Sequence, residues 1–178
     1  MRSTLIWLAG GLAGLGIHES GHVLTSALLG AQPSVRAIQA GPVPFFAITH
    51  ESVTAPKEFV ISASGLWMQG ASVEWLLHER PQLARERAPF LKGVFAFHVA
   101  TSTLYGIAGF ARVGPEERDT KGMSMTTGIP EPAIGGLVLA PAALDLYRYF
   151  RPDSKWAKWA SRGAKVVLIG LVFAADRP

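Results

Sequence analysis

Apolar residues in this chain fall into long segments that polar stretches separate. The long apolar segments cover residues 4–29, 59–77, 90–110 and 133–150. Segments of this length with few charges are typical of helices that cross a membrane. A fifth segment, residues 155–175, begins with basic and tryptophan residues and predicts an interfacial helix with its basic residues on one face. The pattern predicts an all-α polytopic membrane protein with about four to five helices.

Residues 31–56 follow a different pattern. Residues 35–40 alternate between apolar and polar, Gly41-Pro42 is typical of a turn, and residues 45–50 are mostly apolar. This order predicts a short β-hairpin after the first helix. Because unpaired strand edges cannot face lipid, we expect the hairpin to pack on helices or to line a wet cavity. The polar stretch 112–130 is interpreted as a loop.

Composition supports a membrane protein. Hydrophobic residues make up 49% of the 178 residues and charged residues 17%, which predicts a single membrane domain over residues 1–178 with its core at 4–150. There is no cysteine, so a metal must be held by His, Asp or Glu. The net charge of +4 is interpreted as contact with anionic lipid and not with nucleic acid. The distribution of basic residues predicts that the N-terminus lies in the cytoplasm, and we expect the membrane to be a bacterial inner membrane.

A His-Glu-x-x-His pattern lies inside the first apolar segment. In a helix, His18 and His22 are one turn apart on the same face and can share one metal ion. Glu19 lies beside them, where it can take a proton from water at the metal. Two imidazoles and a carboxylate are costly to bury in apolar surroundings unless a partner holds them. The pattern predicts a zinc site with Glu19 as the catalytic base.

Four residues are candidates for the third protein ligand of this zinc site, and the sequence does not decide between them. The candidates are Asp119, Asp145, His50 and His98. Asp119 is the first choice and Asp145 the alternative, although Asp145 can instead pair with Arg148 one turn away. His50 and His98 are also candidates for binding substrate. Each has an ordinary structural explanation as well, a surface position for His50 and a hydrogen bond to a helix carbonyl or to Ser102 for His98.

The segment from His18 to His22, followed by an apolar stretch and Leu29-Gly30, resembles the first core helix of the site-2 protease family, the intramembrane zinc metalloproteases. The order of a strand-like hairpin, a helix with the small residues 62–65 and a later aspartate is similar as well. In that family an Asp-Gly motif after an Asn/Pro-containing stretch supplies the third ligand. Here Pro115 precedes Asp119 without an Asp-Gly pair, and Leu144-Asp145 after Pro141 is the rival match.

The resemblance implies an intramembrane zinc metalloprotease that cleaves membrane-embedded substrates. The hairpin would then pair with an extended substrate strand. The alternative is a non-catalytic member of the same architecture, a structural or regulatory subunit of a membrane complex, which the missing Asp-Gly pair and the short chain favour. A small metal transporter is a third possibility, but the apolar residues 5–15 lack the polar path that transport requires.

Overall fold

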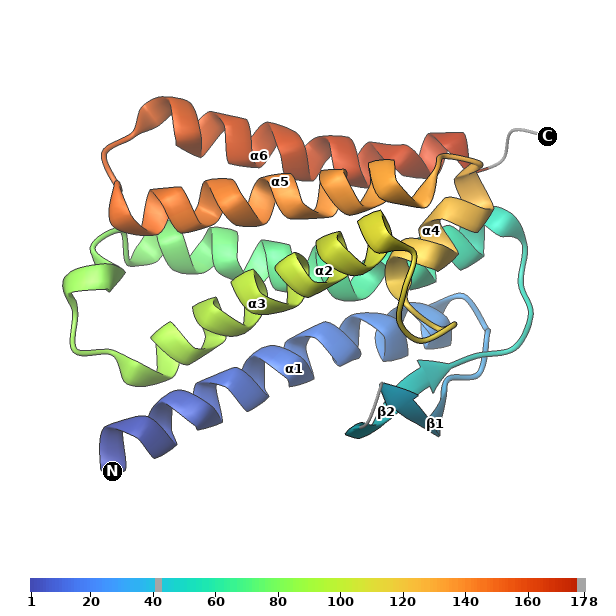
Figure 1. The fold of residues 1–178 in the computed structure, drawn as a ribbon, viewed down its shortest axis with the longest axis horizontal. Helices are drawn as coiled ribbons and strands as arrows, with labels where there is room; N and C mark the ends of the chain where they lie inside the picture. The colour runs from blue at the N-terminus through green and yellow to red at the C-terminus, as the bar shows by residue number, and fades with distance from the viewer. Residues whose placement is uncertain (41–42, 176–178) are drawn as a thin grey trace.

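The structure is a computed structural model that describes residues 1–40 and 43–175. The described residues form six α-helices and one two-stranded antiparallel sheet (Figure 1). In chain order the elements are α1 (Arg2–Leu28), β1 (Ser34–Ala40), β2 (Val43–Thr49), α2 (Ala55–Glu79), α3 (Pro89–Ala111), α4 (Asp119–Thr127), α5 (Glu131–Phe150) and α6 (Lys155–Gly170), with short 3₁₀ helices at Leu83–Arg85 and Leu171–Ala174.

The long helices lie side by side, and the small elements gather at one end of them (Figure 1). Helix α1 packs against α2 and α3, α3 packs against α5, and α5 packs against α6. The hairpin and α4 lie at the end where α1 finishes, so they surround its C-terminal half. The expected hairpin is present, with Ser34 opposite Thr49, whereas the expected Gly41-Pro42 turn lies outside the described residues.

Helices α1 and α3 approach so closely that backbone meets backbone. A Cβ atom added to Gly10 would lie 2.0 Å from the carbonyl oxygen of Phe90, and one added to Gly93 would lie 2.0 Å from that of Trp7. Only glycine permits such a contact, which is the packing that small residues allow between neighbouring helices. These glycines fix how α1 lies across the bundle, and therefore where its histidines point.

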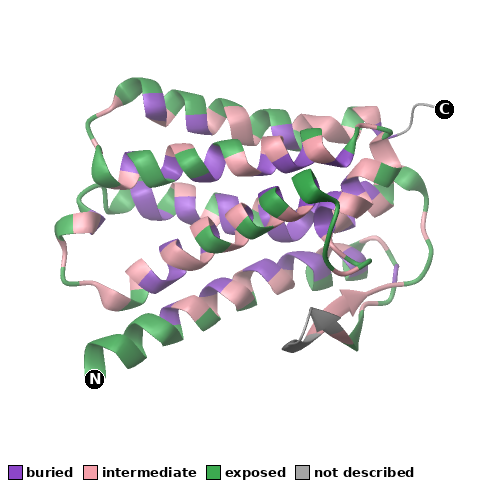
Figure 2. Ribbon diagram, viewed as in Figure 1, coloured by how far each residue is buried: buried purple, intermediate pink, exposed green. Residues whose placement is uncertain are grey.

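The main apolar core holds α4 in place. Its fully buried side chains include Phe59 from α2, Met123 from α4 and Ile134 from α5. In Figure 2 the buried residues, drawn in purple, recur along the helices of the bundle, whereas the N-terminal turns of α1 are exposed. Met123 has no exposed surface, so it anchors the middle of an otherwise polar helix. The interpretation of residues 112–130 as a loop is therefore wrong for Asp119–Thr127, which form α4. Met123 is the one buried apolar residue among these nine, so the sequence shows no helical periodicity of apolar positions there.

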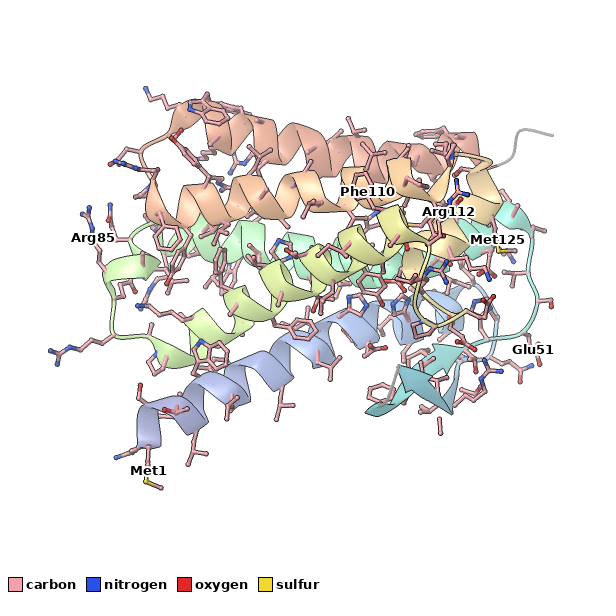
Figure 3. The ribbon with its side chains drawn as sticks, viewed as in Figure 1. Met1, Glu51, Arg85, Phe110, Arg112 and Met125 are labelled. Atoms are coloured by element: carbon pink, nitrogen blue, oxygen red, sulfur yellow. The ribbon has the colours of Figure 1, made fainter. Side chains whose placement is uncertain are left out.

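The prediction of a polytopic membrane protein is also wrong. Among the described helices, only α3 is long and apolar enough to cross a membrane, and 33% of its most apolar window is buried. In α1 the residues His18, Glu19 and His22 interrupt the apolar run, and other helices carry inward-facing charges such as Asp145. The C-terminal end of α3 does leave apolar surface exposed, since Phe110, which lies over Gly136 of α5, is 56% exposed (Figure 3).

The basic face expected on the last helix is turned partly inward. The Arg162 Nε atom lies 2.8 Å from Glu74 Oε1, and Lys165 Nζ lies 3.0 Å from Glu74 Oε2. Trp156 and Trp159 are instead exposed on the outside of α6. The reason is that α2 carries the partly buried Glu74 and α5 the fully buried Asp145, and both carboxylates need a cation beside them.

Candidate metal centre

Helix α1 brings the two histidines of the His-Glu-x-x-His pattern together. Their Nε2 atoms are 3.3 Å apart, and their side chains are buried, with 2% of His18 and 7% of His22 exposed. The four-residue spacing places both rings on the face that α1 turns toward α2. The sequence prediction of a histidine pair on one helical face is confirmed.

Two glycines let α2 lie directly against the histidine pair. A Cβ atom on Gly21 would lie 2.5 Å from the carbonyl oxygen of Ser64, so α1 touches the α2 backbone there. A Cβ atom on Gly65 would lie 2.4 Å from His22 Nε2 and 2.7 Å from His18 Nε2. The small residues 62–65 therefore form the floor on which both imidazoles rest.

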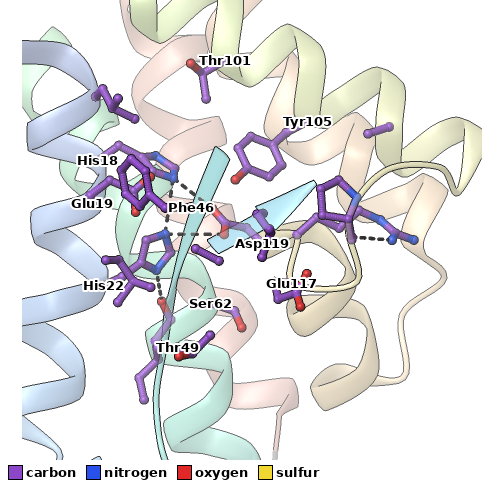
Figure 4. Close-up of a pocket in the computed structure, with 18 of the residues that line it drawn as sticks. His18, Glu19, His22, Phe46, Thr49, Ser62, Thr101, Tyr105, Glu117 and Asp119 are labelled. Carbon is purple, nitrogen blue, oxygen red and sulfur yellow. Dashed lines mark hydrogen bonds and ion pairs between the residues drawn. The ribbon is translucent and has the colours of Figure 1, made fainter. Parts of the chain in front are cut away.

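Asp119 completes a triangle with the two histidines (Figure 4). Its Oδ2 atom is 3.4 Å from His18 Nε2, its Oδ1 atom is 3.5 Å from His22 Nε2, and 5% of the residue is exposed. Asp119 is the first residue of α4, and its neighbours Arg118 and Thr120 both donate hydrogen bonds to Glu131 at the start of α5. This clamp fixes the start of α4 and so directs the Asp119 carboxylate toward α1.

The outer nitrogen of each imidazole has a fixed partner. His18 Nδ1 lies 2.9 Å from Gln69 Oε1, and the Gln69 amide in turn donates to Ser102 Oγ. His22 Nδ1 lies 2.8 Å from the carbonyl oxygen of Ile61. Both acceptors require a proton on Nδ1, which leaves the Nε2 lone pairs directed at Asp119. Metal-ligating histidines are oriented in this way in zinc sites.

The centre of the triangle favours positive charge. Burial alone would lower the pKa of His22, but the charge of Asp119 and the hydrogen bonds to Asp119 and Ile61 raise it to about 9. Burial likewise opposes the Asp119 carboxylate, yet the two histidines hold its pKa well below the usual range. Without a metal a proton balances the carboxylate, and a divalent cation would replace that proton.

The distances fit a tetrahedral zinc site. Zinc binds His and Asp at about 2.0–2.1 Å, which separates the ligand atoms of a tetrahedron by about 3.3–3.4 Å. Here the two Nε2 atoms are 3.3 Å apart, and each lies at a similar distance from one carboxylate oxygen of Asp119, His18 3.4 Å from Oδ2 and His22 3.5 Å from Oδ1. One ligand atom from each of the three residues lies within 4.8 Å of the others, so a small shift of the carboxylate would bring one oxygen to both histidines. Asp119 Oδ2 is buried and accepts no hydrogen bond in the described part of the chain, although it lies 3.4 Å from His18 Nε2, and a cation bound between the two would interact with it directly. Three protein ligands leave the fourth position for water or substrate.

Glu19 lies beside this triangle on the wall of a cavity of about 580 Å³ (Figure 4). Burial raises its pKa, against the opposing effect of His18 and His22. The cavity is bounded by α1, β2, α2, α3 and the segment before α4. A carboxylate with a raised pKa beside three candidate metal ligands is suited to accept a proton and pass it on.

No family model, curated protein or solved structure matches this chain.

The other predicted residues lie elsewhere or at the rim. Asp145 is fully buried near Ser161, Arg148 and Lys165, and its Oδ2 atom is 3.3 Å from His98 Nε2. Neither Asp145 nor His98 joins the triangle or lines the cavity. His50 does line the cavity, where its Nε2 atom is 3.5 Å from Glu58.

Sequence reasoning missed the residues that support the ligands. Gln69 orients His18, and Glu131 holds the start of α4, but neither belongs to a motif. The one sequence signal for such a supporting residue was Gln69, a polar residue inside the apolar helix α2. A buried amide must find hydrogen-bond partners, so its presence there indicates a polar contact with a neighbouring element.

Proposed function

We propose that this chain is a zinc-dependent peptide hydrolase of the site-2 protease type, acting on extended segments of membrane proteins. The observation that carries the proposal is the group of His18, His22 and Asp119, buried residues that each offer one ligand atom within 4.8 Å of the others, as a zinc ion requires. Glu19 adds a base, and the cavity gives room for a peptide.

Glu19 has the position of a general base. When bound at the triangle, a divalent ion acidifies water and polarises a peptide carbonyl. Glu19 takes the proton from the water as the oxygen attacks the carbonyl carbon, and later delivers that proton to the leaving nitrogen. Gln69 and the Ile61 carbonyl keep the two imidazoles in one orientation throughout, because they hold both Nδ1 protons.

Strand β2 gives the cavity a wall suited to an extended substrate. In the described part of the chain, β2 pairs with β1 alone, and its residues 46–49 line the cavity. An extended peptide can add to the outer edge of such a strand through backbone hydrogen bonds. The remaining walls carry the apolar side chains of Leu15, Phe97 and Leu104, which favours substrates with large apolar residues near the cleaved bond.

The test is cleavage by the zinc-loaded protein, purified in detergent and assayed with β-casein as an unfolded probe and mass spectrometry as the readout. The wild type should carry one zinc per chain and cleave. Glu19→Gln should keep the zinc and lose at least about 100-fold in rate. Glu58→Gln is the matched control, because Glu58 lines the same cavity but pairs with Ser62 and His50.

Two results would contradict the proposal. A Glu19→Gln variant as active as the wild type would remove the assigned base. A wild type that binds one zinc tightly but cleaves nothing, and that co-purifies with other membrane subunits, would favour the non-catalytic subunit instead.

We also propose that the chain works at a bacterial inner membrane with its N-terminus in the cytoplasm. Helix α3 is long and apolar enough to cross a membrane, and Leu5 and Leu12 of α1 are 64% and 70% exposed. Arg2 at the start of α1 supports the orientation. The protein should stay with membranes through an alkaline carbonate wash, and its complete release would contradict this location.

A further inference from the structure

Tyr105 of α3 lies over the metal triangle. Its ring stacks on that of His18, with centroids 5.9 Å apart and planes 23° from parallel. The side chain lines the cavity, and its hydroxyl end is directed toward Asp119 (Figure 4). A hydroxyl group is therefore held at the place where the carbonyl of a bound peptide must approach.

Close packing of α3 on α5 fixes this position. A Cβ atom on Gly106 would lie 3.0 Å from Leu139 Cβ, and one on Gly135 would lie 2.8 Å from the carbonyl oxygen of Gly106. Helix α3 cannot rotate without separating these backbones. Tyr105, the residue before Gly106, is therefore directed into the cavity by the backbone as well as by its stacking on His18.

The Tyr105 hydroxyl interacts with Asp119, the residue assigned as third ligand, and most other side-chain donors on the cavity wall have partners away from the histidines. Ser62 donates to Glu58, the Thr49 hydroxyl lies 2.9 Å from that of Ser34, and Arg118 forms a two-pronged pair with Glu131. His50 Nδ1 lies 2.8 Å from the carbonyl oxygen of Glu51. Thr101, one turn before Tyr105 on α3, is a second hydroxyl on the same wall. Of the two, Tyr105 is the one stacked on a metal ligand.

We propose that the Tyr105 hydroxyl donates a hydrogen bond to the carbonyl oxygen of the peptide bond being cleaved, an inference that rests on the proposed hydrolase function. As the water oxygen forms its bond to the carbonyl carbon, an electron pair moves onto the carbonyl oxygen, and Tyr105 stabilises that charge without giving up its proton. The pair then returns, the carbon–nitrogen bond breaks, and Glu19 supplies the proton for the amine. Donors placed for this developing charge contribute more to the transition state than to substrate binding.

The experiment compares Tyr105→Phe with Thr101→Val, which removes the other hydroxyl of this wall. Tyr105→Phe should lower kcat by about 100-fold with little change in KM. It should also lower the affinity for a peptide phosphinate, a mimic of the tetrahedral transition state, by about the same factor as it lowers kcat/KM. Affinity for the product peptides should stay unchanged. Thr101→Val should change none of these. Zinc affinity and the visible spectrum of the cobalt-substituted protein should be the same in both variants and the wild type.

The outcomes separate this inference from the function beneath it. An active wild type, an inactive Glu19→Gln and a fully active Tyr105→Phe would overturn the role of Tyr105 alone. Loss of zinc affinity or an altered cobalt spectrum in Tyr105→Phe would also overturn it, because Tyr105 would then act through Asp119 as a positioning residue. A zinc-loaded wild type without hydrolase activity would overturn the function and the inference together.

Discussion

Gly65 is the position where one added methyl group tests the metal site most directly. It lies inside α2 beneath both imidazoles, and the Cβ of an alanine would be 2.4 Å from His22 Nε2 and 2.7 Å from His18 Nε2. Optimal contact between such atoms is about 3.5 Å, so the rings would have to retreat by about 1 Å. A metal site tolerates errors of only about 0.2 Å in its ligand distances. Gly65→Ala should therefore prevent the two histidines from binding one ion together.

The expected loss is large for zinc and small for the fold. Changes to partners that merely orient ligands cost about 10–100-fold in metal affinity, so displacing two ligands should cost at least about 100-fold. Overpacking costs about 1–3 kcal/mol, and alanine recovers about 1 kcal/mol of helix propensity, which leaves a net loss of stability of about 0–2 kcal/mol. Zinc affinity is measured by competition with a chromogenic chelator, and stability of the zinc-free protein by thermal unfolding.

Gly70→Ala is the matched control for this experiment. Gly70 lies in the same helix, and a Cβ there would meet no atom within 4 Å. This variant should bind zinc like the wild type and be slightly more stable. If Gly65→Ala also bound zinc with wild-type affinity, the imidazoles would not rest on α2, and the assignment of the site would be refuted.

Three further predictions concern the choice of third ligand, the clamp at the start of α4 and the ion cluster between α2, α5 and α6. Asp119→Asn should weaken zinc binding by at least about 100-fold. Asp145→Asn should leave zinc affinity unchanged but lower the free energy of unfolding by about 3–5 kcal/mol, because it breaks a buried ion cluster. If both variants changed zinc affinity equally, the choice of Asp119 as ligand would be contradicted. Glu131→Gln should weaken zinc binding by about 10-fold, because it loosens the start of α4 and therefore the position of Asp119. Chelator competition measures this affinity, and an unchanged value would mean that the clamp does not position Asp119. Burial opposes the Glu74 carboxylate, but the cations around it, Arg148 first, hold its pKa well below 4.5. The stability it provides is therefore present above pH 4.5 and lost on acidification, so urea unfolding should show a steep fall between about pH 5 and pH 2 that is weaker in Glu74→Gln.

The sequence predicted the parts of the site that local rules control. Helical periodicity places His18 and His22 on one face whatever the surroundings, and the alternation after residue 34 predicts the hairpin. The choice of Asp119 over Asp145 rested on a loose match to a family pattern. The structure brings Asp119 to the histidines because α4 is clamped to α5 through Glu131, a contact that no spacing rule contains.

The apolar segments were a poor guide to the environment of the helices. Their length and composition suggested several membrane spans, but among the helices that the structure describes only α3 is long and apolar enough to cross a membrane. Charged residues that appear isolated in the sequence, such as Glu74 and Lys165, are partners across helices that lie far apart in the chain. Their burial is acceptable only because folding brings opposite charges together.

By itself, then, the sequence determined that one helix presents two imidazoles and a carboxylate side by side, because that spacing follows from the geometry of the α-helix. The tertiary structure decided which acid faces them, which backbone supports them and which hydroxyl lies above them. Those choices depend on close contacts at Gly65, Gly106 and Gly135 and on the anchoring of α4, where residues distant in the chain meet at distances that only the folded packing sets.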